Sequence, residues 1–388
     1  MQDSKNLKED IYLEDTTLRD GEQGPGIAFP KEVKIAIHDL LVAAGVRWIE
    51  AGIPAMGGEE LDTLKTLLAR GSDATLVGWS RGLRSDVAFT LDIGFKAIHI
   101  ALPTSTIHLE SRLNQDRKWL LDRAKEVVNY AKERGAYVSI SAEDVGRTEI
   151  PFLQDYACTV LEAGADRLRL SDTIGILTPE QYAQRVRAVK EVCDIELQCH
   201  THNDFGLAVA NALAGLEAGA RSFHVTVNGI GERAGMADLA QVVMTLKCLY
   251  GVELGIDSKQ LSSLSNFVAE AVHQRVVPWQ PIVGAHVFAH ESGIHAKAML
   301  SNTATFEPFP PEWVGGCRHY VIGKHSGRAV LQFVLKENGI DVAIEELGPC
   351  MDAVKDAATR QGRSLTSEQV KEIFYQVQRS QDFALSER

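Results

Sequence analysis

Eight short apolar runs, repeated along the first 250 residues, constrain the fold of this chain more than any other feature of its sequence. Each run is rich in β-branched residues and has the length of a buried strand. Between the runs lie stretches in which apolar residues recur at helical spacing. Eight strands that alternate with helices predict an α/β fold, a (β/α)8 or TIM barrel. The expected strands cover 11–18, 47–54, 74–81, 96–103, 137–144, 167–173, 195–202 and 222–229, and the clearest helices cover 30–45, 57–71, 115–134, 178–192 and 205–219.

The rest of the chain has a different pattern. Beyond residue 255 helical spacing dominates, interrupted by a Pro- and Gly-rich irregular stretch at 278–316. The sequence therefore predicts a catalytic barrel over 1–255 and an α-rich C-terminal appendage over 256–388. The helices expected in the appendage cover 258–275, 325–338, 341–359 and 366–379.

Composition argues against several kinds of protein. Lys and Arg total 40 against 52 Asp and Glu, so the formal net charge is −12. This acidic balance argues against nucleic acid or an anionic membrane surface as the main partner. The polar start, MQDSKNLKED, is unlike a signal peptide, and no apolar run approaches the roughly 18 residues of a membrane helix. The six cysteines form no CxxC pair, which favours a reduced, cytoplasmic setting.

Two histidines at the end of the seventh expected strand are the sharpest chemical signal. His200 and His202 are two residues apart, so a strand places both rings on one face, where both can reach a single metal. Asp20, after the first strand, would complete a two-His-one-carboxylate set. Taken alone, the HxH pattern fits a surface strand equally well. Glu143 and Thr173 follow other strands at the same rim, and they favour the metal site.

The charged neighbours of these residues allow two interpretations each. Arg19 and Asp20 could form a structural ion pair across the barrel mouth. In a turn beyond the strand, Arg19 would instead place a cation where an anionic substrate oxygen lies. Glu143 could be a salt-bridge partner of Arg147, but carboxylates at strand ends are favoured positions for acid–base chemistry.

Six motifs, in order between residues 12 and 330, carry a resemblance to a known family. They are LEDTTLRDGEQGPG, SDTIG, HTHNDFGLAVAN, NGIGERAG, HESGIH and GKHSG. The chain resembles the acyl-CoA-condensing branch of the metal-dependent TIM-barrel lyase superfamily, which includes isopropylmalate, citramalate and homocitrate synthases. The resemblance implies a divalent metal (Mg, Mn or Zn) that binds a 2-oxo acid. It also implies deprotonation of acetyl-CoA, attack of the enolate on the keto carbon, and hydrolysis of the thioester.

The resemblance also implies a role for each matching residue. The metal ligands would be Asp20, His200 and His202, the stabiliser of the developing alkoxide Arg19, the proton-transfer groups Glu143 and His295, and the substrate contacts Gln23, Ser141 and Thr173. It further implies a homodimer in which residues near 290–330 cover the barrel mouth of the neighbouring copy.

Two positions depart from the family pattern. Met236 stands where the family commonly has Asn, and Phe306 where many relatives have Tyr. Met is a poor ligand for a hard cation, so water would fill that coordination position. These departures also motivate an alternative of another class, a metal-binding pseudoenzyme without turnover.

The substrate is predicted from shorter matches. IEAGIPAMGGEE and SRLNQDRKW are similar to the homocitrate synthases of nitrogen-fixing bacteria, which implies 2-oxoglutarate as the acid and homocitrate as the product. Arg81, at the end of the third strand, is then the candidate for the distal carboxylate. The alternative is the same condensation on oxaloacetate, phosphonopyruvate, pyruvate or 2-oxoisovalerate.

Overall fold

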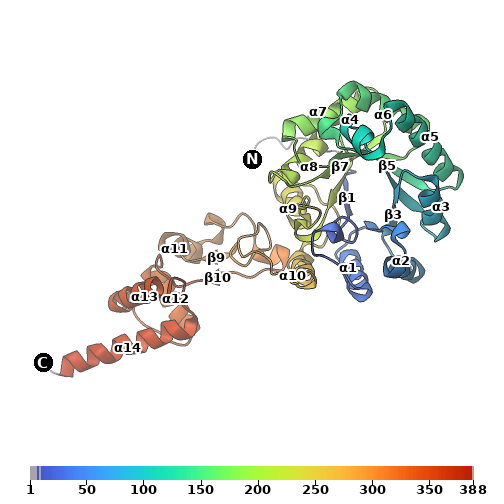
Figure 1. Ribbon diagram of the computed structural model, residues 1–388. Coiled ribbons are helices and arrows are strands. Elements are labelled where there is room, and N and C mark those ends of the chain that lie inside the picture. Colours follow the sequence, from blue (N-terminus) through green and yellow to red (C-terminus); the bar gives the residue numbers. More distant parts are fainter. Residues whose placement is uncertain (1–6, 8–9, 387–388) are drawn as a thin grey trace. The chain divides into compact units, whose positions relative to one another are not determined.

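The computed structural model describes residue 7 and residues 10–386. The chain forms two compact units, divided between Val276 and Val277, which are described separately below (Figure 1). Among the described residues, no helix combines the length and apolar character needed to cross a membrane. The six cysteines all lie in the described part and are free thiols. The cytoplasmic location stays a prediction.

The first unit is a closed barrel of eight parallel strands, as the sequence predicts. The strands follow one another in chain order, and β8 pairs with β1 to close the barrel. They are β1 (Tyr12–Asp15), β2 (Trp48–Gly52), β3 (Thr75–Arg81), β4 (Ala97–Ala101), β5 (Tyr137–Glu143), β6 (Arg167–Asp172), β7 (Glu196–Thr201) and β8 (Ser222–Val225).

Helices surround this barrel (Figure 1). They are α1 (Lys31–Ala43), α2 (Gly58–Arg70), α3 (Arg84–Asp92), α4 (Thr106–His108), α5 (Arg117–Glu133), α6 (Ile150–Glu162), α7 (Pro179–Lys190), α8 (Ala208–Glu217), α9 (Leu239–Thr245) and α10 (Leu261–Ala271). A capping box begins α7, because Gln181 N donates to Thr178 Oγ1 at 3.4 Å and Thr178 N donates to Gln181 Oε1 at 3.0 Å.

The division between the units lies later than the boundary at 255 that the sequence predicts. Residues 256–276, including α10, belong to the first unit. Asn228 Nδ2 donates to the carbonyl of Ser265 at 2.8 Å, and Asp257 N donates to the carbonyl of Ala44 at 2.8 Å. The helical spacing is real, but these bonds attach the helix to the barrel.

The strands bury both faces, and the inner face is charged. Arg167 and Arg169 on β6 both contact Glu14 on β1 across the barrel, so the alternating Leu168 and Leu170 face the helices. The interior polar side chains are at most 1% exposed: Glu14, Glu50, His99, Arg167, Arg169, Gln198 and His224. The floor beneath the barrel mouth is therefore a network of ion pairs.

The second unit has its own apolar core. It contains α11 (Gly293–Ser301), α12 (Arg328–Glu337), α13 (Gly348–Gln361), α14 (Ser367–Ser386) and a two-stranded parallel sheet of β9 (Ala289–His290) and β10 (His319–Tyr320). The sequence predicts an irregular stretch at 278–316, whereas the structure has α11 there. Ala296 and Met299 are buried on this helix, and Gly293 lies against the backbone of Gly327, where a Cβ would meet Gly327 N at 2.9 Å.

Candidate active site

A polar cavity of about 240 Å³ opens at the carboxyl ends of the barrel strands. Eight of the residues that the sequence analysis proposes line it: Arg19, Asp20, Gln23, Ser141, Glu143, Thr173, His200 and His202. The remaining lining residues are Trp79, His99, Arg112, Arg169, Ser171 and Glu232. Strand ends that are far apart in the sequence thus contribute to one site.

Three of the lining residues have the geometry of a metal site. One ligand atom each from Asp20, His200 and His202 lies within 4.8 Å of the others. His200 Nε2 is 3.2 Å from His202 Nε2 and 3.8 Å from Asp20 Oδ2. All three side chains are buried, and burial lowers the pKa of His200 well below its usual range, so that its ring is neutral.

The surroundings of these three side chains fit a bound cation. Two imidazole nitrogens that face each other at 3.2 Å repel one another if both carry lone pairs, and a cation beside them removes the repulsion. Asp20 Oδ1 is buried and has no hydrogen-bond partner among the described residues. Two imidazoles and one carboxylate are ligands for a divalent transition metal.

Arg19 is held beside this group by three partners. Its Nη1 donates to Asp20 Oδ2 at 2.7 Å and to Gln23 Oε1 at 3.0 Å, and its Nε donates to Glu50 Oε1. Although burial alone would lower the pKa of Arg19, the charges of Glu50 and Asp20 raise it, so the guanidinium keeps its charge. The cation is therefore fixed at the edge of the candidate metal site. Glu50, on β2, is absent from the sequence-based predictions.

The polar atoms of Glu143, Ser141 and Thr173 already have hydrogen-bond partners within the chain. Glu143 Oε2 accepts from Arg112 Nη2 at 3.2 Å, so its partner is not Arg147. Ser141 Oγ accepts from the backbone N–H of Leu102 at 3.2 Å, and Thr173 Oγ1 accepts from Asp144 N at 2.8 Å. Both residues line the cavity, but these bonds use part of the hydrogen-bonding capacity of their hydroxyl groups.

A second cluster of ligand-type atoms lies deeper in the barrel. Glu14, Glu50 and His224 have such atoms within 4.8 Å of one another. Arg169 Nη2 lies 3.2 Å from Glu14 Oε1 and 2.7 Å from Glu50 Oε2, so a guanidinium already supplies the positive charge. This cluster is an ion-pair network.

Comparisons with known proteins agree with this geometry. The model of the HMGL-like family matches residues 10–268, and that of the homocitrate synthase post-HMGL domain-like family matches residues 282–362. Over 368 residues the chain is 59% identical to a 2-phosphonomethylmalate synthase of Streptomyces rubellomurinus, covering 95% of this chain and 99% of the relative. It belongs to the HMGL-like family.

More distant relatives have related names. The chain is 46% identical to 2-isopropylmalate synthase 2 of Caldanaerobacter subterraneus, covering 94% of each chain. It is 43% identical to homocitrate synthase 1 of Nostoc, covering 93% of this chain and 96% of the relative. These homologues are synthases that condense 2-oxo acids with acetyl-CoA, and the family uses a divalent metal and an acyl-CoA.

A solved structure supports the fold alone. The hydroxymethylglutaryl-CoA lyase from Pseudomonas aeruginosa has a TM-score of 0.62 at 22% sequence identity. The match covers 70% of this chain and 95% of that chain.

The structure corrects the prediction for Arg81. Its side chain is 61% exposed, does not line the cavity, and is paired with Asp86 through a bond of 2.6 Å from Nε to Oδ2. Arg81 is the last residue of β3, whereas Trp79 on the same strand reaches the cavity. Arg112, in the short helical turn Leu109–Leu113, lines the cavity instead, and its side chain is 53% exposed.

The structure also places three other positions that the sequence analysis singles out. His295 lies on α11 of the second unit, exposed and stacked on Phe306 with ring centroids 4.0 Å apart, and its part in proton transfer stays a prediction. Met236 is 1% exposed and pairs with His202 through an isolated β-bridge. In the GKHSG motif, the N–H of His325 donates to Glu291 Oε1 at 3.2 Å, so the chain supplies its own anion.

Three residues in or beside the candidate site that the sequence analysis missed share one signal. Glu50, His99 and Arg169 are charged or polar residues within strands that are buried on both faces. Such residues must face the interior of the barrel, because the outer face packs under helices. The alternation RLRLSD on β6 carries this signal in the sequence. Arg112 carries no comparable signal, because it lies in a loop.

Proposed function

We propose that this chain condenses acetyl-CoA with phosphonopyruvate in a divalent-metal-dependent reaction that yields 2-phosphonomethylmalate and CoA. One observation carries the proposal: the chain is 59% identical to a 2-phosphonomethylmalate synthase, and the match covers 99% of that relative's length. A synthase of that product must join the methyl carbon of an acetyl group to the keto carbon of phosphonopyruvate. Phosphonopyruvate is one of the alternative acids that the sequence analysis leaves open.

The residues at the barrel mouth suit each step. Asp20, His200 and His202 would hold the metal, which supplies a Lewis acid that polarises the keto group of the 2-oxo acid. Glu143 would take a proton from the acetyl methyl group, and the resulting carbon nucleophile then forms the new bond to the keto carbon.

Arg19 would stabilise the charge that develops on the keto oxygen, since Asp20, Gln23 and Glu50 fix its orientation before the reaction. Water then cleaves the thioester, which releases the CoA thiol and leaves the new carboxylate.

Arg112 is the candidate contact for the phosphonate. Arg19 and Arg169 each contact more than one acidic side chain, whereas Arg112 lines the cavity with a 53% exposed side chain and pairs with a single carboxylate among the described residues, that of Glu143. A guanidinium binds phosphonate oxygens through two parallel N–H bonds.

A second candidate substrate is 2-oxoglutarate, which the sequence analysis favours. The match of residues 282–362 to the homocitrate synthase post-HMGL domain-like family and the 43% identity to homocitrate synthase 1 of Nostoc support it. Its distal carboxylate lies one carbon further from the keto group than the phosphonate does, so the two acids require different positions for Arg112.

Thiol release from acetyl-CoA by the Mn²⁺-loaded protein tests the proposal. The acids to compare are phosphonopyruvate, oxaloacetate, 2-oxoglutarate, pyruvate and 2-oxoisovalerate. We expect the highest kcat/KM for phosphonopyruvate. A preference for 2-oxoglutarate would replace it with the second candidate, and silence with all five acids would favour the pseudoenzyme.

Arg112→Ala tests the phosphonate contact. We expect it to raise the KM for phosphonopyruvate at least about tenfold, the loss of one charged hydrogen-bonding partner, with little change for pyruvate. Arg81→Ala is the matched control, because Arg81 is also exposed but lies outside the cavity. Equal effects of Arg112→Ala on both acids would remove Arg112 from phosphonate binding.

A further inference from the structure

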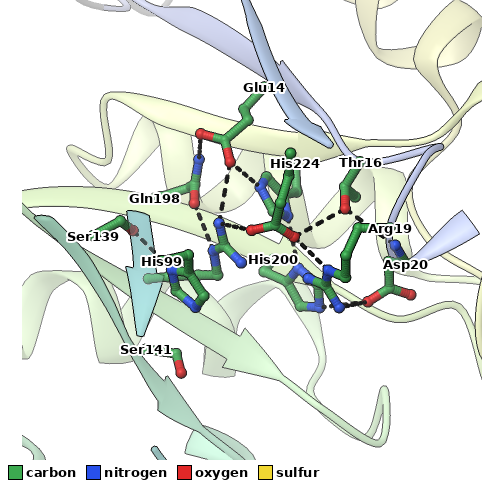
Figure 2. Close-up of polar contacts among 12 residues, drawn as sticks. Glu14, Thr16, Arg19, Asp20, His99, Ser139, Ser141, Gln198, His200 and His224 are labelled. Carbon is green, nitrogen blue, oxygen red and sulfur yellow. Dashed lines mark hydrogen bonds and ion pairs between the residues drawn. The ribbon is translucent and has the colours of Figure 1, made fainter. Parts of the chain in front are cut away.

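A chain of buried hydrogen bonds leads from the candidate metal site to a carboxylate inside the barrel. His200 Nδ1 lies 2.9 Å from His224 Nδ1, and His224 Nε2 lies 2.9 Å from Glu14 Oε1. Figure 2 shows the three side chains in this order, with His200 beside Asp20 and Glu14 on the opposite side of His224. Glu14 and His224 are fully buried. The function described above uses neither of them.

The charge on Glu14 is set by its neighbours. Arg167 Nη2 and Gln198 Nε2 donate to Glu14 Oε2, and Arg169 Nη2 and His224 contact Oε1. Although burial raises the pKa of this carboxyl, the charges of Arg167 and Arg169 and the hydrogen bond from His224 lower it to about 2. Glu14 is therefore ionised, and an ionised carboxylate only accepts hydrogen bonds.

The ionised carboxylate and the ion pairs around it determine where the hydrogens lie along this chain of side chains. Because Glu14 accepts, His224 Nε2 carries the hydrogen. Arg167 and Arg169 already supply the positive charges beside Glu14, so His224 is the neutral link between Glu14 and His200, and its Nδ1 bears only a lone pair. His200 Nδ1 must then donate to His224 Nδ1. His200 Nε2 is left without a hydrogen, and it is this nitrogen that faces Asp20 and His202.

We propose that Glu14 and His224 are positioning residues that hold His200 in its metal-binding tautomer even before a metal arrives. The opposite tautomer would point an N–H at the metal position and a lone pair of His224 at the carboxylate of Glu14. A metal-binding histidine usually donates its other ring N–H directly to a carboxylate, a backbone carbonyl or water. Here the imidazole of His224 lies between His200 and the carboxylate of Glu14. The inference rests on the proposed metal site and is independent of which 2-oxo acid reacts.

Titration of the metal-free full chain with Mn²⁺, followed by calorimetry, tests this inference. We expect His224→Phe to weaken Mn²⁺ binding about 10- to 100-fold, the range for loss of such a partner. His224→Asn places an amide oxygen where Nδ1 lies, so it should recover most of the affinity. His38→Phe is the matched control, because His38 is also buried with both ring nitrogens bonded, to Asp39 and Ser72, and it does not line the cavity.

The outcomes separate this inference from the proposed metal site. If the wild-type chain does not bind Mn²⁺, the metal site itself is wrong. If the wild type binds and a folded His224→Phe variant binds equally well, the positioning role is wrong.

A measurement on the wild-type protein covers the case in which His224→Phe does not fold. The ¹⁵N chemical shifts of the histidine rings in the metal-free chain report the tautomer of His200, assigned by comparison with His200→Gln. We expect hydrogen on Nδ1. Hydrogen on Nε2 of His200 would overturn the inference.

Discussion

At the scale of single residues, the site depends on side chains that hold other side chains. Arg19 has hydrogen bonds to Asp20, Gln23 and Glu50, which leave its guanidinium one orientation. A lysine at this position would keep the charge but could not make the same forked set of bonds.

Arg19→Lys should therefore lower kcat more than it changes the KM for the 2-oxo acid. The expected loss in kcat is about 10²- to 10³-fold, the effect of removing one donor to a developing oxyanion. Steady-state kinetics of thiol release measure it. Arg187→Lys, a change of the same kind at an exposed position on α7, is the control. A variant of Arg19 with wild-type kcat would contradict the assigned role.

Asp15 makes folding stability depend on pH. Its carboxyl lies at the end of β1, fully buried and bonded to Thr17, and burial raises its pKa to about 7 from an ordinary value of 3.8. Between these two values the folded chain holds a proton that the unfolded chain releases. The contribution of Asp15 to stability is thus complete below about pH 4 and is lost as the pH rises through about 7.

Asp15→Asn should remove this loss. In the wild type, the group contributes a decrease of up to about 4 kcal/mol in the free energy of unfolding between pH 4 and pH 8. Urea unfolding followed by tryptophan fluorescence at pH 5 and pH 8 compares the two proteins. An identical pH dependence in the variant would mean that Asp15 is ionised in the folded state.

At the scale of elements, the sequence predicts the barrel well because strand and helix periods differ. All eight expected strands exist, and those at Tyr137–Glu143 and Arg167–Asp172 agree within one residue at each end. The helix at Arg84–Asp92 has only a weak helical spacing of apolar residues, which explains why it is not among the expected helices. The sequence also predicts the site residues at the strand ends, because a buried core does not tolerate unpaired polar side chains there.

The rest of the site could not be predicted from strand ends alone. Arg112 lies in a loop whose conformation depends on contacts distant in the sequence, and its partner Glu143 belongs to another strand. The same dependence explains the misplacement of Arg81, because the last residue of a strand can turn outward to a local partner such as Asp86.

Packing of α8 against β7 holds the two metal-site histidines in place. A Cβ at Gly215 would meet Cys199 Sγ at 2.4 Å and Tyr182 Cε1 at 2.8 Å. Cys199 precedes His200 on β7, and Tyr182 donates to the carbonyl of Leu170 on β6 at 2.7 Å. The close approach of α8 to β7 at Gly215 therefore affects the position of His200, the next residue after Cys199.

Gly215→Ala should destabilise the barrel by about 1–3 kcal/mol, the usual cost of overpacking, and should also weaken Mn²⁺ binding. Chemical unfolding and Mn²⁺ titration measure the two effects. Gly348→Ala is the control, since nothing lies within 4 Å of its Cβ position at the start of α13. A Gly215 variant that matches the wild type in both measurements would show that α8 does not restrain β7.

At the scale of the whole molecule, the sequence predicts two parts but not where they divide. A helical period alone does not say which neighbour a helix packs on, and α10 packs with the barrel unit. The assembly state stays a prediction that depends on the family resemblance. Sedimentation analysis should give twice the 42.5 kDa mass of one chain, and a single-chain mass at micromolar concentration would contradict a homodimer.

The central claim is that the barrel mouth forms a carbon–carbon bond between an acetyl group and a 2-oxo acid. The most direct test supplies acetyl-CoA labelled with ¹³C at its methyl carbon, phosphonopyruvate and Mn²⁺, and follows the label by NMR. The account predicts that the methyl signal is replaced by a methylene bonded to a quaternary carbon, with one CoA thiol released for each product. Release of CoA with the label retained in the methyl group of acetate would contradict it.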